Sequence, residues 1–453
     1  MSADTEPMDT ATPTDAIDYD GEFDAIVVGA GLAGSAAALT MAGEGLNPIV
    51  IERGQSPGTK NVFGGVLFTP TIRELVDLDD APLERYVAEK RYGFLSERDE
   101  TAVSMRPGEW LDEPHNDAYT VLRGDFDEWF AEQAEEAGAT VITETTVTDV
   151  LRDDEGRVVG VDTDRPNGDL RAPVVILAEG ANSLVGEGAG LRDHHERDEV
   201  AVTAKEVLKF DRDTIEERFR LHGEAGAAYN YFGEGAVGDA VGGGYVYTNK
   251  RTVSVGVVYR IEDAAQGQSP DEVLDAFKQH PAIAPLVRDG HLVEYSAHAV
   301  PEGGADAMPD LVQDGALIVG DAAGLVLNNG VHLEGTNMAV ESGYHAGRAV
   351  ASAISEGGVD DRALATYETE LEHSFVVQNL EHYDFFQGLI AEDREFIFRE
   401  LPRALADAEA EYFRMDRQPK EEHVQNAKDR LLEAFGGRLG ALKRAWKYRK
   451  MLS

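Results

Sequence analysis

A group of three glycines, spaced as Gly29-x-Gly31-x-x-Gly34, lies between an apolar run and an alanine-rich stretch. In this spacing Gly29 permits a tight turn, Gly31 lets backbone N–H groups approach a pyrophosphate, and Gly34 lets a helix pack closely on a strand. The positive N-terminus of that helix would then face the two phosphates. These residues therefore predict the binding of a dinucleotide, and the alternative is a glycine-rich turn that holds no nucleotide.

Glu52 ends the next apolar run, at about the distance of twenty residues that is typical of such sites. Its carboxylate can accept hydrogen bonds from both ribose hydroxyls and would repel a 2′-phosphate. We assign Arg53, the next residue, to the same site. The glycines and Glu52 do not distinguish FAD from NAD.

Gly320 and Asp321 follow a distant apolar run in the segment ALIVGDAAG, and Gly335, Thr336 and Asn337 begin a helix further on. This Gly-Asp pair resembles the second FAD motif of the glutathione-reductase-type flavoproteins. The resemblance implies that Asp321 binds the ribityl chain, and that the helix N-terminus stabilises negative charge at the pyrimidine end of the flavin. The alternative is that Asp321 only caps a helix.

Two further segments resemble cofactor-binding segments of the same flavoproteins. Arg123, in VLRGDFDEWF, would lie near the FAD phosphates and ribose. Glu179, Gly180 and Ser183, in VVILAEGANS, follow an apolar strand in a pattern also found in aromatic hydroxylases. The ordinary alternative for this second segment is a strand end with a capped turn.

Five longer segments carry a more specific resemblance: VIERGQSPGTKNVFGGVLF, TVLRGDFDEWFAEQAEEAGA, GGGYVYTNKRTVSVGVV, FKQHPAIAPLVRDGHLVEYSAHAVPEGG and GDAAGLVLNNG. Together they resemble the FixC family of flavoprotein subunits, which are similar to electron-transferring-flavoprotein–quinone oxidoreductase and related to geranylgeranyl reductases. The resemblance extends over residues 22–345 and weakens over the C-terminal region. It implies that the loop containing Lys60, Asn61, Gly64 and Gly65 lies against the isoalloxazine of FAD.

The resemblance implies an FAD-dependent oxidoreductase that accepts electrons from an electron-transferring flavoprotein and passes them to a menaquinone-like quinone. Single-chain oxidoreductases of this kind hold a [4Fe–4S] cluster through cysteines, and this sequence contains no cysteine. FixC-type subunits instead use a separate ferredoxin-like iron–sulfur subunit, which is thereby implied as a partner. His332 is a weak candidate for a quinone proton source, although surface or packing roles are commoner for such a histidine. We expect no metal site.

Two other functions remain open. The first is a geranylgeranyl-reductase-like enzyme that saturates isoprenoid chains, which would need a long apolar tunnel through the region inserted in the FAD-binding domain. The second is a flavin-bearing scaffold of an electron-transfer complex. A flavin remote from any cleft would favour the scaffold.

The chain of 453 residues has 85 acidic and 41 basic side chains, for a formal net charge of −44. Such self-repulsion opposes folding in dilute buffer, whereas the Debye length falls to about 3 Å in 1 M salt. The charge therefore predicts a halophilic host, with an acidic mesophilic protein as the alternative, and it excludes nucleic acid as a partner. Because we find neither a long apolar run nor a signal pattern, we expect a cytoplasmic location.

The order of apolar runs predicts an α/β fold in which a Rossmann-type FAD-binding domain of the glutathione-reductase type carries an inserted antiparallel sheet for the substrate or quinone. A C-terminal helical region follows. The predicted segments are a disordered acidic tail at 1–21, the discontinuous FAD-binding domain at 22–75, 120–200 and 300–355, the insert at 76–119 and 201–299, and the helical region at 356–453.

The segment 438–453 has six basic residues and no acidic one. Apolar residues recur at helical spacing from just before this segment into it, at Phe435, Leu439, Leu442 and Trp446. A basic amphipathic helix with a tryptophan is typical of a peripheral anchor, here on the inner face of the cell membrane. The alternative is a helix that docks on its own acidic domain.

Overall fold

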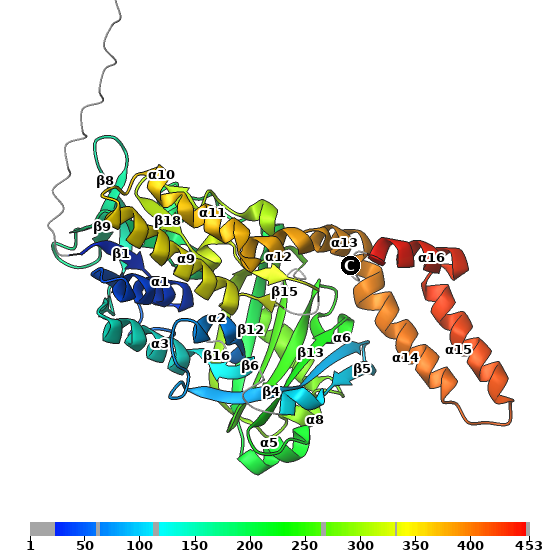
Figure 1. The fold of residues 1–453 in the computed structure, drawn as a ribbon. Helices are drawn as coiled ribbons and strands as arrows, with labels where there is room; N and C mark the ends of the chain where they lie inside the picture. Colours follow the sequence, from blue (N-terminus) through cyan, green and yellow to red (C-terminus); the bar gives the residue numbers. More distant parts are fainter. Residues whose placement is uncertain (1–22, 60–63, 112–116, 264–268, 331–332, 450–453) are drawn as a thin grey trace, which may run out of the picture.

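The computed structural model describes residues 23–59, 64–111, 117–263, 269–330 and 333–449. They form a Rossmann-type half, a second half built on a large sheet, and a C-terminal arm of helices that projects from the body (Figure 1). The predicted α/β class is confirmed. The predictions for the tail 1–21 and for Lys60, Asn61 and His332 lie outside the described residues.

The Rossmann-type half contains a six-stranded sheet in which all strands except β17 are parallel. In sheet order the strands are β17 (Val312–Gln313), β18 (Ala316–Ile318), β11 (Val175–Leu177), β1 (Ala25–Val28), β2 (Pro48–Ile51) and β7 (Thr140–Ile142). The central strands are short, fully buried apolar runs, as expected for a parallel sheet covered on both faces. A small antiparallel sheet adds β8 (Val147–Arg152), β9 (Val158–Thr163) and β10 (Leu170–Arg171).

Helices α1 (Leu32–Gly43), α3 (Arg123–Ala137) and α9 (Thr336–Ser355) pack together in this half. A Cβ at Gly34 would lie 1.9 Å from the carbonyl oxygen of Gly29, and one at Gly343 would lie 2.1 Å from that of Ala33. Helix α1 can therefore approach the preceding turn, and α9 can approach α1, only because both positions are glycine.

The second half is a nine-stranded sheet that is mainly antiparallel, with β13 and β4 parallel to each other. Its strands are β16 (His291–Pro301), β12 (Val200–Lys209), β15 (Thr252–Arg260), β14 (Gly242–Thr248), β13 (Ala225–Phe232), β4 (Leu83–Leu95), β6 (Ala118–Leu122) and β3 (Gly64–Phe68), with β5 (Glu100–Met105) paired to β4. Strand β3 lies in the predicted segment 22–75, yet it pairs with β6 and is part of this large sheet.

Alternate residues of this sheet face opposite directions. One face packs on α7 (Pro270–Gln279), where Leu208, Val255 and Phe277 share a buried core. The other face is turned toward the Rossmann-type half. Shorter elements complete the body: α2 (Pro70–Arg73), α4 (Leu184–Gly188), α5 (Arg212–Phe219), α6 (Glu234–Val237), α8 (Ala284–Val287), β19 (Leu327–Asn328) and β20 (Leu333–Glu334).

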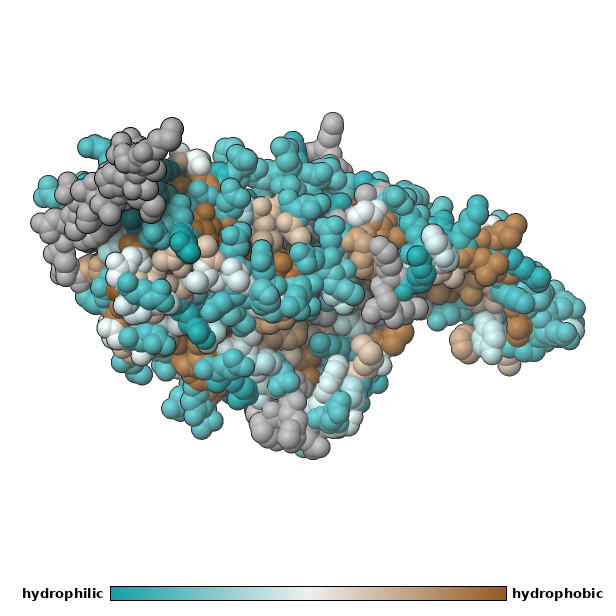
Figure 2. Space-filling model, turned by 45° about the horizontal axis from the view of Figure 1, so that its top comes forward, coloured by the Kyte–Doolittle hydropathy of each residue, from teal (hydrophilic) through white to brown (hydrophobic). Residues whose placement is uncertain are grey.

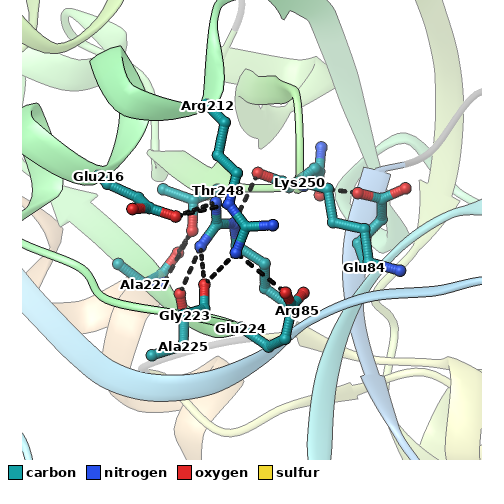
Figure 3. A network of polar contacts seen from close by, with 11 residues as sticks. Glu84, Arg85, Arg212, Glu216, Gly223, Glu224, Ala225, Ala227, Thr248 and Lys250 are labelled. Atoms are coloured by element: carbon teal, nitrogen blue, oxygen red, sulfur yellow. Dashed lines mark hydrogen bonds and ion pairs between the residues drawn. The ribbon is translucent and has the colours of Figure 1, made fainter.

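Buried Arg85 connects several segments at one end of the large sheet through hydrogen bonds (Figure 3). Its guanidinium donates to the carbonyl oxygens of Asn249 at 2.9 Å, Gly223 at 3.0 Å and Ala225 at 2.9 Å. Glu216 lies 3.4 Å from the same group and pairs with Arg212. One fully buried side chain thus joins β4 to the start of β13 and to the turn after β14.

Replacing Arg85 by methionine is expected to lower the free energy of unfolding by about 3 kcal/mol, because three carbonyl groups then lose a buried donor. Urea titration in molar salt measures the change. Arg98→Met removes an exposed arginine beyond the opposite end of β4 and serves as the control. A loss below about 1 kcal/mol would mean that the network does not stabilise the sheet.

The C-terminal region is helical, comprising α10 (Asp361–Leu364), α11 (Thr366–His373), α12 (Phe375–Tyr383), α13 (Phe385–Glu395), a π-helical turn at Phe396–Glu400, α14 (Leu401–Tyr412), α15 (Lys420–Ala434) and α16 (Gly437–Lys447). Helices α14 and α15 form the projecting hairpin (Figure 1). Buried His423 joins them, with its ring nitrogens 2.9 Å from Glu411 and 3.0 Å from Asp416. Hydrogen bonds to these carboxylates raise the pKa of His423.

Helix α16 returns to the body and docks there through one of its sides. Arg444 lies over the ring of Phe396 at 3.7 Å, and Lys447 pairs with Asp393 at 3.0 Å. The hydroxyl of Tyr448 donates to Asp393 at 2.8 Å. Within the described ranges, no helix combines the length and apolar character needed to cross a bilayer.

Candidate functional site

A cavity of about 640 Å³ lies between the Rossmann-type half and the large sheet. The predicted cofactor residues in its lining are Gly29, Gly31, Glu52, Arg53, Arg123, Gly180, Asp321, Gly335 and Thr336. They belong to turns after parallel strands and to the first residues of α3 and α9. This carboxyl edge of the strands is where open α/β sheets bind ligands.

The turn between β1 and α1 forms one end of the cavity. Gly29 has a φ of +102°, and a Cβ there would lie 2.5 Å from the carbonyl oxygen of Ala178. The Glu52 carboxylate accepts hydrogen bonds from the backbone N–H of Ala30 at 3.0 Å and of Gly54 at 2.6 Å. These bonds hold the carboxylate beside the N-terminus of α1, so a pyrophosphate and its ribose can be bound side by side.

Arg123, Asp127 and Asp321 form a charged group on the cavity wall, in which Asp127 is buried and the other two are half-buried. Two nitrogens of Arg123 lie 2.5 and 2.7 Å from the Asp127 carboxylate. Burial would lower the pKa of Arg123, but the two aspartates outweigh this effect and raise it. Burial raises the pKa of Asp321, and Arg123 opposes that shift. An ionised Asp321 is costly here unless a ligand donates hydrogen bonds to it.

The N-terminus of α9 is open toward the cavity. Its N-cap residue is Gly335, and no side chain, Asp321 included, caps it. The Oδ1 atom of Asn337 is buried without a hydrogen-bond partner among the described residues. Donors and one acceptor are therefore left for a bound group, and the glycine turn, Glu52, Arg123, Asp321 and this helix end together fit FAD.

The strand end at Glu179 forms a capped turn. Glu179 accepts hydrogen bonds from the backbone N–H of Val185 at 2.7 Å and of Gly186 at 2.8 Å, so it caps α4. Burial raises the pKa of Glu179, and these two bonds oppose the shift. The capped turn at a strand end, which was the ordinary alternative for this segment, is therefore present. Gly180 and Ser183 nevertheless line the cavity.

The remaining predicted residues that the structure describes lie next to the cavity lining and are not part of it. Gly320 has a φ of +62° and lets its turn pass close to Ala33 of α1. Asn337 donates to Glu334 at 3.1 Å. Gly64 and Gly65 are in β3, next to Val66 in the cavity lining.

Sequence reasoning missed the inward face of the large sheet. The residues that it contributes to the cavity include Phe68, Lys90, Tyr92, Phe94, Thr203, Asn230, Phe232, Tyr245, Tyr247, Val258, His298 and Val300. Alternation of aromatic residues, as in AYNYF and GYVYT, was the available signal, but it does not identify the face that a strand turns inward. This surface is aromatic and holds few charges.

The far end of the cavity is apolar and belongs to the C-terminal region. It is lined by Phe386, Leu389, Ile390, Phe396, Ile397, Phe398, Leu401 and Tyr448. We call these eight residues the apolar rim. The cavity thus continues from the nucleotide turn, past the large sheet, to the base of the arm.

This fold and cavity define a FAD-dependent oxidoreductase. A protein-family model described as "FAD binding domain" matches residues 22–381. Protein FixC of Bradyrhizobium diazoefficiens is 42% identical over 88% of this chain and 92% of that protein. A probable electron transfer flavoprotein-quinone oxidoreductase, YdiS of Escherichia coli, is 42% identical over 89% of this chain and 93% of its own.

The chain therefore belongs to the FixC family of FAD-binding flavoproteins. Among solved structures, a geranylgeranyl bacteriochlorophyll reductase-like protein from Thermoplasma acidophilum matches with a TM-score of 0.71. The two chains are 21% identical, and the match covers 95% of this chain and 99% of that one. This likeness extends the shared fold to the C-terminal region.

Proposed function

We propose that this protein takes electrons from an electron-transferring flavoprotein and passes them to a quinone with an isoprenoid tail, similar to menaquinone. FAD supplies the electron-carrying chemistry. Glu52, Arg123, Asp321 and the first residues of α9 would hold it, and the glycine turn would accept its phosphates. The relative from Escherichia coli, a probable electron transfer flavoprotein-quinone oxidoreductase, supports both the donor and the acceptor.

The observation that carries the proposal is the continuity of the cavity. An aromatic sheet face lies next to the cofactor residues, and the apolar rim lies beyond it. A quinone has a flat ring that suits the first surface and an isoprenoid tail that suits the second. A scaffold without a substrate needs neither surface, so the cavity argues against that alternative.

A geranylgeranyl-reductase-like activity is the second candidate. The apolar rim would also accept an isoprenoid chain as substrate, and the fold of the solved reductase-like protein is shared. The long segments that resemble FixC, and the identity to FixC proteins, favour electron transfer instead.

We further propose a separate ferredoxin-like iron–sulfur subunit as a partner, because the chain has no cysteine to bind a cluster. The net charge of −44 supports a halophilic host. We place the protein in the cytoplasm, on the inner face of the membrane that would hold the quinone.

Helix α16 would provide the membrane contact. Leu439, Leu442 and Trp446 are 76%, 67% and 69% exposed, and we call them the apolar triad. Arg438 and Lys443 are exposed beside them. Figure 2 shows hydrophobic residues gathered on the projecting arm, while hydrophilic residues cover most of the body. Because α16 docks on Phe396 of the apolar rim, a membrane at α16 would lie beside the entrance for the quinone tail.

An anaerobic experiment tests the proposal. The protein-bound FAD is reduced with the cognate electron-transferring flavoprotein in molar salt, and a menaquinone with a long tail is then added. Reoxidation of the flavin, followed by its absorbance, is expected. Failure of the quinone to reoxidise the flavin would overturn the proposal. Loss of double bonds from an added isoprenoid would instead establish the second candidate.

Replacing Ile397 of the apolar rim by arginine is expected to slow reoxidation by a long-tailed menaquinone at least tenfold, because a charge would enter the path of the tail. Reoxidation by menadione, which has no tail, should stay within twofold. Phe413→Arg, at an exposed position on the arm, is the matched control. An equal effect on both quinones would contradict a tail-binding role for the rim.

A further inference from the structure

Lys90 is a cation on the inward face of the large sheet. Its Nζ atom lies 5.6 Å from the centre of the Phe68 ring and 5.6 Å from that of the Trp110 ring. Both Lys90 and Phe68 line the cavity. Within the described ranges no hydrogen bond from Nζ is found, so the ammonium has aromatic neighbours and its N–H donors remain available to a ligand.

Lys90 is a better proton donor than the two tyrosines beside it in this part of the cavity. Tyr92 follows on the same strand, and Tyr247 lies across Ala228, which is paired with both Lys90 and Tyr247. Burial raises the pKa of both tyrosines, so they keep their protons. Burial lowers the pKa of Lys90, and among the residues that the structure describes the charge of Glu334 opposes this shift.

Lys90 and the N-terminus of α9 line the same cavity, since Lys90, Gly335 and Thr336 all belong to its lining. Glu334 directly precedes Gly335, the N-cap of α9, and its charge acts on both Lys90 and Tyr92. The helix N-terminus is the group expected to face the flavin ring. A ligand that lies between the cofactor and the sheet therefore meets the Lys90 ammonium.

We propose that Lys90 binds a carbonyl oxygen of the quinone ring and protonates it during reduction. The inference rests on the proposed function and deepens it. Reducing a quinone to its hydroquinone takes up two electrons and two protons. FAD would supply both electrons and one of the protons, which leaves the second proton to the protein. One O–H bond forms as an N–H bond of Lys90 breaks, and the neutral amine recovers its proton from the solvent.

Two substitutions separate binding from proton transfer. Lys90→Met removes the charge, and should weaken menaquinone binding and slow flavin reoxidation by roughly 100-fold or more. Lys90→Arg keeps the charge but is a poor acid, because the guanidinium does not lose its proton. The arginine variant should bind the quinone within about threefold of the unmodified protein and still reoxidise slowly. Lys209→Met, at an exposed position of β12, is the matched control.

The measurements are the dissociation constant of menaquinone for the oxidised protein, the rate of reoxidation from pH 6 to 10, and the rate of flavin reduction by the electron-transferring flavoprotein. The reoxidation rate should fall as pH rises through the pKa of Lys90, and this dependence should vanish in Lys90→Met. The rate of flavin reduction should not change. If Lys90→Arg reoxidises as fast as the unmodified protein, or if Lys90→Met binds and reacts normally, the inference is wrong. If quinone fails to reoxidise the unmodified protein, the proposed function itself is wrong.

Discussion

Replacing Asp321 by alanine is expected to lower the affinity for FAD by about 100-fold. The carboxylate is half-buried on the cavity wall, and Arg123 is the charged neighbour that acts on it. A charge-assisted hydrogen bond in such a place contributes about 1.5–3 kcal/mol, and two of them to a ribityl chain would account for at least this factor. The measurement is a fluorescence titration of apoprotein with FAD in molar salt, together with the flavin content after gel filtration.

Two variants make this result specific. Asp321→Asn keeps the shape and one acceptor oxygen, so it should recover part of the affinity. Asp310→Ala removes an exposed acidic residue earlier in the same segment and should leave affinity unchanged. Affinity within threefold of the unmodified protein for Asp321→Ala would refute the assignment. In that case the role of Asp321 would be limited to stabilising the charge of Arg123.

The cofactor half of the site could be predicted because its determinants are local in sequence. Each glycine turn directly follows an apolar strand, and the parallel sheet brings the ends of β1, β2, β11 and β18 to one edge. Gly29 and Asp321 are therefore placed by short-range patterns and one topological rule. No knowledge of strand pairing within the second half was needed.

The side of the cavity formed by the large sheet could not be predicted in the same way. Lys90 and Tyr247 approach each other only because β4 pairs in parallel with β13 and β13 pairs with β14. The register shifts by one residue at Gly226 and Ala227, and such a shift exchanges the faces to which side chains point. Long-range register of this kind leaves no local pattern, whereas His332, a neighbour of the helix in sequence, was easy to single out.

The basic C-terminal helix shows how a sequence pattern can carry two roles. Docking and membrane contact were alternatives in the sequence, since both need one apolar stripe. In the structure Arg444, Lys447 and Tyr448 attach α16 to Asp393 and Phe396, while the apolar triad points outward. Deleting 438–453 would therefore remove both the docking contacts and part of the apolar rim, and would not isolate membrane binding.

Replacing the apolar triad, Leu439, Leu442 and Trp446, by glutamine is the sharper test. The variant should lose at least about 100-fold in its partition onto vesicles, because burial of a leucine or tryptophan side chain contributes roughly 1.5–3 kcal/mol. Sedimentation with phosphatidylglycerol vesicles in molar salt measures the partition. At that salt concentration the Debye length is about 3 Å, so electrostatic attraction to the vesicles is screened and the binding measured is mainly apolar.

The matched control replaces three exposed apolar residues of the large sheet, Val103, Leu292 and Val293, by glutamine. It removes a similar apolar surface from the body and should leave vesicle binding unchanged. Flavin reoxidation by menadione should be normal in both triple variants, since the docking side of α16 is intact, whereas reoxidation by vesicle-borne menaquinone should fall only in the α16 variant. Equal sedimentation of the two variants would contradict the membrane contact. The apolar triad would then have to face another protein, and the ferredoxin-like subunit would be the first partner to test.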